Sequence, residues 1–196
     1  MSMLRPTVTG LVTLLLFSCG SPESKNQEEA SKAAAAFFPV NDYISSQIKK
    51  VDSLQLPVTR YYSGPDSKDT VALSLEDFRA QAAPFLQEDI SMEPLKGKYQ
   101  ESSFADQSIP SITFTYHTKD SSLPIKRVDV ILKPDPVMTD QVKSVYIEKV
   151  YQKGDTLVNE KLFWKADHYY QVIQSRQVKD NPPTMSQLKV VWDPTE

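Results

Sequence analysis

From residue 99 onward, the hydrophobic pattern of the chain repeats at every second residue. Ile112, Phe114 and Tyr116 alternate with polar residues, and the same period returns over 128–132. Because successive side chains of a strand point to opposite faces of a sheet, this period predicts strands with one buried and one solvated face. Turn-forming sequences separate the segments. The C-terminal part of the chain therefore predicts an antiparallel meander of five or six strands.

The clearest hairpin lies in the middle of this meander. A long strand is expected over 142–152, followed by Lys-Gly-Asp-Thr at 153–156. Glycine at the first central position favours a two-residue type II′ turn, so the chain is expected to return over 157–165. After a second turn, a further strand is expected over 169–178, and the last alternating segment ends at Trp192.

Two amphipathic helices are predicted before the meander. Apolar residues recur at three- and four-residue steps over 39–54, the spacing of one helix face. Ser-Leu-Glu-Asp at 74–77 has the form of a capping box and predicts the start of the second helix. Pro84 is expected to kink or end that helix. The β-prone segments 58–63 and 69–73 flank a turn sequence and are expected to pair as a hairpin.

These elements together predict an α+β fold. A sheet with one apolar face needs a cover, and the two helices are the available one. The expected architecture is two N-terminal helices packed on a curved antiparallel β-meander sheet. A half-barrel, a cystatin-like fold and a cone of the nuclear-transport-factor type all satisfy the pattern, and the sequence does not choose between them.

The N-terminus has the layout of a secretory signal peptide. Arg5 precedes an apolar run over 11–17, and small residues follow. The run is too short for a bilayer, whose core of about 30 Å needs roughly 20 residues. Leu16-Phe17-Ser18-Cys19 resembles the lipobox of bacterial lipoproteins. The resemblance implies cleavage before Cys19, the single cysteine, and a thioether link from Cys19 to diacylglycerol. An ordinary signal peptide cut nearby, or a buried thiol, is the alternative.

The predicted organisation has three parts. Residues 1–18 are a lipoprotein signal peptide, 19–36 are the lipidated cysteine and a flexible tether, and 37–196 form a single α+β domain. The lipoprotein resemblance implies a membrane partner through the lipid anchor at Cys19 and a place in the bacterial cell envelope. Gly20 after the cysteine favours the outer membrane, with the domain facing the periplasm.

Composition and motifs exclude several classes of function. The net charge of −3 leaves no basic surplus for phosphates, so no nucleic-acid partner is expected. One cysteine excludes an internal disulfide and a cysteine-rich zinc site. The nucleophile elbow, the zinc-protease motif and the glycine-rich phosphate loop do not occur. We therefore expect no catalytic residues, no metal site and no cofactor.

Two histidines lie close to carboxylates. His117 precedes Asp120 by three residues, and His168 follows Asp167 directly. Such a pair is able to act as an acid–base unit. The alternative is two surface histidines in a polar strand and a turn, and we favour it because no other chemical group converges on either residue.

Aromatic residues are the remaining candidates for a site. In the adjacent pairs Phe163-Trp164 and Tyr169-Tyr170, the two side chains must face opposite sides of the sheet. One of each pair therefore belongs to the core and the other to the outer face. The predicted binding surface consists of Trp164, Tyr169, Tyr170 and Tyr146. The alternative is cross-strand aromatic packing that only stabilises the sheet.

The sequence predicts a lipid-anchored envelope protein that acts as a non-catalytic interaction or accessory module. Its expected partner is another envelope protein or a glycan, bound through the sheet. The first alternative is a carrier that holds a lipid or another hydrophobic ligand between sheet and helices. The second alternative is an enzyme of unknown class.

Overall fold

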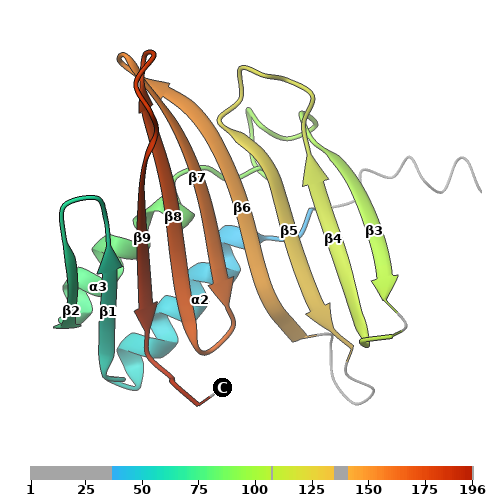
Figure 1. Ribbon diagram of the computed structural model, residues 1–196. Coiled ribbons are helices and arrows are strands. Elements are labelled where there is room, and N and C mark those ends of the chain that lie inside the picture. Colours follow the sequence, from blue (N-terminus) through green and yellow to red (C-terminus); the bar gives the residue numbers. More distant parts are fainter. Residues whose placement is uncertain (1–36, 107, 135–140, 196) are drawn as a thin grey trace, which may run out of the picture. The chain divides into compact units, whose positions relative to one another are not determined.

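One antiparallel sheet carries the fold in the computed structural model, which describes residues 37–106, 108–134 and 141–195 (Figure 1). The sheet has nine strands in the order β2-β1-β9-β8-β7-β6-β5-β4-β3. The strands are β1 (Val58–Ser63), β2 (Lys68–Leu73), β3 (Gln100–Asp106), β4 (Ser111–His117), β5 (Ile125–Lys133), β6 (Gln141–Lys153), β7 (Thr156–Lys165), β8 (Tyr169–Val178) and β9 (Thr184–Val191). The expected α+β class is confirmed. The expectation of five or six meander strands was too low, because β3 to β9 pair in chain order as seven.

The predicted hairpin β1–β2 continues this sheet. Val58 to Ser63 pair with Leu73 to Lys68 on one side, and β1 pairs with β9 on the other, with Thr59 opposite Val191. The alternation of a strand does not depend on which strand lies beside it. The sequence pattern therefore predicted the hairpin without showing where it joins the sheet.

The predicted helices are present as α2 (Val40–Ser53) and α3 (Leu75–Ala82). The hydroxyl of Ser74 accepts a hydrogen bond from the backbone N–H of Asp77 at 3.0 Å, which satisfies one free donor of the first turn of α3. Pro84 lies in η2 (Ala83–Phe85), a short 3₁₀ helix that follows α3 directly. The expected effect of this proline on the second helix is confirmed.

Both helices lie behind the sheet in Figure 1, so we call that side the helix-bearing face and the side toward the viewer the helix-free face. The core lies on the helix-bearing face and is dominated by aromatic rings. Trp164 stacks on Tyr170 with ring centroids 5.2 Å apart, and Phe85 meets Trp164 edge-on at 5.2 Å. Phe78 of α3 meets Trp192 edge-on at 5.6 Å. The helices and the strands thus share one aromatic core.

Polar contacts add to this packing at the end of α2. Lys50 donates to the carboxylate of Asp167, in the β7–β8 turn, at 2.7 Å, and Gln47 donates to the same oxygen at 3.2 Å. Arg79 of α3 pairs with Asp52 of α2 at 2.7 Å. Asp167 has a φ of 64°, which is a left-handed backbone conformation. The turn that brings its carboxylate to α2 therefore contains a residue in an uncommon conformation.

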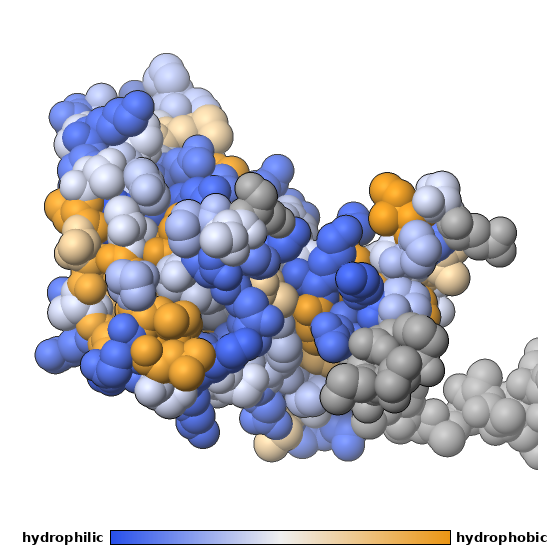
Figure 2. Space-filling view, turned by 90° about the horizontal axis from the view of Figure 1, so that it is seen from below, coloured by the Kyte–Doolittle hydropathy of each residue, from blue (hydrophilic) through white to orange (hydrophobic). Residues whose placement is uncertain are grey.

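The surface at the lower end of Figure 1 is mixed. Figure 2, seen from that end, shows hydrophobic patches separated by hydrophilic residues. Within the described part of the chain, no helix has the length and hydropathy needed to cross a membrane. The signal peptide, Cys19 and the tether lie outside the described residues, so their assignment stays a prediction.

Candidate functional site

The four aromatic residues of the predicted binding surface lie on opposite faces. Trp164 and Tyr170 are fully buried in the core, so they are not part of an exposed surface. Tyr169 and Tyr146 lie on the helix-free face and are half-buried. The alternation of each strand explains the split, because Phe163 takes the outward position beside Trp164. The prediction of one inward and one outward residue per pair is confirmed, whereas the choice of Trp164 as an outward residue is wrong.

The outward aromatic residues meet across neighbouring strands. Phe163 lies opposite Tyr146, and its ring centroid is 5.9 Å from that of Tyr169. The amine of Lys189 lies 4.0 Å from the centre of the Tyr169 ring, a cation–π distance. Tyr61 lies opposite Lys189 and is 46% exposed. We call these five residues, Tyr61, Lys189, Tyr169, Phe163 and Tyr146, the aromatic row.

All residues of the aromatic row except Tyr169 belong to a line of paired residues that crosses eight strands. At the far side of this line, Thr115 donates to Asp129 at 2.7 Å, and Arg127 pairs with the same carboxylate oxygen at 2.8 Å. Burial first, and then the charge of Glu148, raise the pKa of Tyr146, so its hydroxyl stays protonated and able to donate. In strand order, the line is Tyr61, Lys189, Gln171, Phe163, Tyr146, Asp129, Thr115 and Ser102.

The helix-free face is basic although the chain is acidic. By strand register, its described charged residues are Lys68, Arg127, Lys133, Lys161, Lys165 and Lys189 against Asp106, Asp129 and Glu148. This surplus of three positive charges contrasts with the net charge of −3 of the whole chain. Four of the exposed large hydrophobic side chains lie on the same face, namely Tyr61, Phe104, Leu157 and Met185.

Neither histidine forms the acid–base pair that sequence proximity suggested. The carboxylate of Asp120 accepts bonds from the backbone N–H and hydroxyl of Ser122 at 2.9 and 2.6 Å, so it closes a turn. Asp167 is engaged by α2, as described above. His168 instead lies 3.7 Å from Asp193. His117 lies on the helix-free face, opposite Arg127.

The helix-bearing face holds a second set of polar residues, which the sequence analysis missed. Lys149 of β6, Glu160 of β7, Gln174 of β8 and Ser186 of β9 lie opposite one another in turn. Lys149 and Glu160 are only 3% and 6% exposed. A signal was available, because Lys149 lies two residues after Ile147 and therefore on the same face.

Hydrogen bonds join these residues into a network. Glu160 accepts from the hydroxyl of Tyr151 at 2.9 Å and from the amide of Gln174, whose oxygen accepts from Arg176. Lys149 donates to the carbonyl oxygen of Pro84 at 2.8 Å. Burial lowers the pKa of the Lys149 amine, and the charges of Glu88 and Glu160 oppose that shift.

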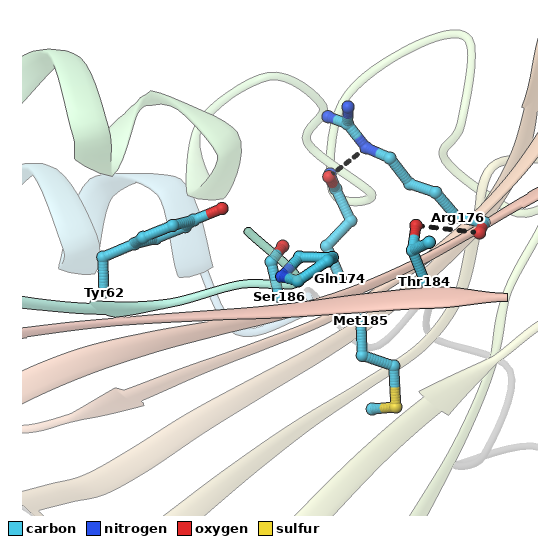
Figure 3. Close-up of a pocket in the computed structure, with 7 residues that line it drawn as sticks. Tyr62, Gln174, Arg176, Thr184, Met185 and Ser186 are labelled. Carbon is cyan, nitrogen blue, oxygen red and sulfur yellow. Dashed lines mark hydrogen bonds between the residues drawn. The ribbon is translucent and has the colours of Figure 1, made fainter. Parts of the chain in front are cut away.

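A groove opens beside this network over β1, β8 and β9. It consists of two cavities of about 360 and 350 Å³ that share Tyr62, Gln174 and Ser186. Figure 3 shows Tyr62, Gln174 and Arg176 on the side of the sheet that carries the helices, while Met185 points to the other side. Two further residues, Arg60 and Gln81, line the second cavity. We call this feature the polar groove.

Among the described residues, no group of three or more histidine, cysteine, aspartate and glutamate side chains is arranged to hold a metal ion. No protein-family model, curated protein or solved structure significantly matches the chain. A functional hypothesis therefore depends on the two faces themselves.

Proposed function

We propose that the protein is a lipid-anchored component of the bacterial envelope, held by Cys19, that binds another envelope protein through its helix-free face. In this proposal the sheet curves around its helices as a half-barrel, and the outer side is the docking surface. The aromatic row is the observation that supports it best. The five side chains come from five strands, and the contacts of Tyr169 with Phe163 and Lys189 order the middle of the row before any partner binds.

The composition of the face fits a protein partner. Aromatic residues, methionine and arginine are enriched at protein interfaces, and the helix-free face exposes Tyr61 of the row together with Phe104 and Met185. Its basic surplus favours a partner with an acidic patch and speeds their encounter at low ionic strength. Small ligands prefer concave sites, whereas a broad face of paired strands offers area for a macromolecule.

An interaction module fits the packing better than a carrier does. Phe78 and Phe85 of the helical segment contact Tyr170 and Trp164 directly, with ring centroids 5.2–5.9 Å apart. Side chains therefore fill the aromatic core between the helical segment and the sheet, where a carrier would hold an apolar ligand.

Site-specific photocrosslinking in the native bacterium tests the proposal. The full-length protein carries a benzophenone amino acid at Tyr169 in one variant and at Tyr146 in another. A matched control carries it at Val178, which is exposed on the helix-bearing face and lines neither cavity of the polar groove. We expect one discrete protein adduct from both outer positions and none from the control.

A second substitution separates docking from chance contact. Lys189→Glu reverses one charge of the row and should reduce the Tyr169 adduct at least several-fold at low salt, while the fold persists. Equal adducts from both faces, or no adduct at either outer position, would overturn the proposal. An adduct that is removed by a glycosidase would show that the partner is a glycan and not a protein.

A further inference from the structure

The polar groove contains buried polar atoms that lack a protein partner. Arg60 donates from one terminal nitrogen to Asp69 at 2.9 Å, yet its Nε, which is buried, has no partner among the described residues. The side-chain oxygen of Gln81 on α3 is also buried without one, as is Oδ1 of Asp69. Arg60 and Gln81 line the same cavity of about 350 Å³. Native proteins pair nearly all buried polar atoms with a hydrogen-bond partner. The unpaired donor of Arg60 and the unpaired acceptor of Gln81, on two residues that line one cavity, therefore suggest that a ligand binds there.

The chemistry of these atoms restricts the occupant. The Nε of Arg60 needs an acceptor, whereas the oxygen of Gln81 needs a donor. A hydroxyl group supplies both. Ser186 and Gln174 continue the groove with further groups able to donate and accept. A ligand with several hydroxyl groups satisfies more of this lining than an apolar one.

Tyr62 gives the groove an aromatic wall, and Gly64 leaves room for the Tyr62 ring. A β-carbon on Gly64 would lie 2.5 Å from the Tyr62 hydroxyl and 2.9 Å from its ring. The only glycines with positive φ among the described residues are Gly97 and Gly154, so the backbone at Gly64 does not itself require glycine. What glycine provides here is room for the Tyr62 ring beside the strand. Aromatic walls of this kind suit the C–H faces of sugar rings.

Arg176 places a positive charge at the other end of the groove. Its Nε donates to Gln174, and no described carboxylate forms an ion pair with it. In Figure 3, the two terminal nitrogens point away from the strands and from the residues drawn beside them. A guanidinium in this position is suited to a carboxylate, which it binds through two parallel hydrogen bonds.

We propose that the polar groove binds a saccharide unit that carries a carboxylate. The sugar ring lies against Tyr62, its hydroxyl groups bridge Arg60 and Gln81, and its carboxylate faces Arg176. The cavities fall within the size range of small-ligand sites. This site lies on the face opposite to the aromatic row, so it does not depend on the proposed docking function.

Isothermal titration and NMR titration of the full-length protein test the proposal, in a detergent without a sugar headgroup. The probes are glucuronate, methyl glucoside, acetate and inorganic phosphate. We expect glucuronate to bind at least tenfold more tightly than methyl glucoside or acetate, because only glucuronate engages both ends of the groove. Equal binding of acetate and glucuronate would overturn the saccharide part, and equal binding of methyl glucoside and glucuronate the carboxylate part. Phosphate binding as tight as that of glucuronate would leave a simple anion site, and an absence of binding by all four would overturn the proposal entirely.

Three variants assign the contacts, and each is checked for folding by thermal unfolding. Arg176→Gln should weaken glucuronate about tenfold and leave methyl glucoside unchanged. Gln81→Ala should weaken both sugars. Gly64→Ala displaces only the end of a side chain and should weaken both sugars while the fold persists. The matched control, Arg127→Gln, removes a guanidinium from the helix-free face and should change neither affinity. If Arg127→Gln weakened glucuronate binding as much as Arg176→Gln does, the assignment of the carboxylate contact to Arg176 would be contradicted.

Discussion

Lys149 on β6 and Glu160 on β7 lie directly opposite each other on the helix-bearing face, and both side chains are buried. Lys149 donates a hydrogen bond to the carbonyl oxygen of Pro84, where the helical segment ends. Glu160 accepts hydrogen bonds from Tyr151 and Gln174 on the two neighbouring strands. The two charges thus connect the helical layer to the sheet across three strands. Their burial is affordable only because each charge has hydrogen-bond partners.

Removing Glu160 should destabilise the fold. Glu160→Ala leaves the Tyr151 hydroxyl and the Gln174 amide without their acceptor, and removes one of the two opposite charges that act on Lys149. We expect the free energy of unfolding to fall by about 3 kcal/mol, the cost of breaking a buried polar pair. Glu160→Gln keeps the shape and an acceptor oxygen, so its free energy of unfolding should fall by less. Urea unfolding followed by circular dichroism measures both, and equal losses would contradict a role for the hydrogen bonds.

The same pair predicts a pH dependence. Burial lowers the pKa of Lys149 in the folded protein, whereas the unfolded chain keeps the ordinary value of about 10.4. Between these two values the unfolded chain binds more protons, so the wild type gains stability as the pH rises. The variant Lys149→Met lacks this titration. The stability of the wild type minus that of Lys149→Met should therefore increase from neutral pH toward pH about 10.

The neighbours of Lys149 determine whether its titration can be followed separately. Glu88 and Glu160 are the charged residues that act on it, and their charges oppose the shift that burial causes. Burial first, and then the bond to Glu160, raise the pKa of Tyr151 to about 12. A stability difference that stays flat or falls with rising pH would show that Lys149 is not desolvated in the folded state.

The adjacent residues Phe163 and Trp164 allow a matched test of the two faces. Trp164 is fully buried against Phe85, Tyr170 and Trp192. Trp164→Ala should cost about 4 kcal/mol in the free energy of unfolding. Phe163→Ala on the helix-free face should cost less than about 1 kcal/mol, a surface-type effect. Thermal and urea unfolding of both variants decide the assignment, and similar costs would refute the split between the faces.

The proposed lipid anchor at Cys19 has a direct chemical test. Cells that express the protein are grown with radiolabelled palmitate, and the label is followed after immunoprecipitation. The wild type should carry the label and fractionate with membranes. Cys19→Ser should lose the label and move to the soluble periplasmic fraction. A labelled Cys19→Ser protein, or an unlabelled wild type, would contradict the lipobox resemblance.

Local patterns predicted the local parts of the fold. Helical spacing over 39–54 predicted α2, and the capping sequence at Ser74 predicted the start of α3. The expected turn after Lys153 is confirmed, since β7 begins at Thr156 and Gly154 has a φ of 59°. Each of these features depends on residues within one turn or one element, where propensity and capping act.

The parts that the sequence analysis missed depend on distant residues. The pairing of β1 with β9, which builds one wall of the polar groove, leaves no trace in the alternation of either strand. The choice of Trp164 as an exposed residue failed because adjacent aromatic residues give the same pattern whichever of them faces inward. Lys149 and Glu160 were overlooked because charged residues are usually placed on the wet face, and only hydrogen-bond partners from other elements allow the opposite.

The seam between β1 and β9 also has a consequence for the order of events in biogenesis. The chain is synthesised from its N-terminus, so the β1–β2 hairpin emerges more than a hundred residues before its partner strand. Until β9 arrives, β1 offers an open strand edge to any neighbouring chain. Such long-range closure is slow compared with hairpin formation. A truncation that removes β9 should therefore promote self-association of the protein through β1.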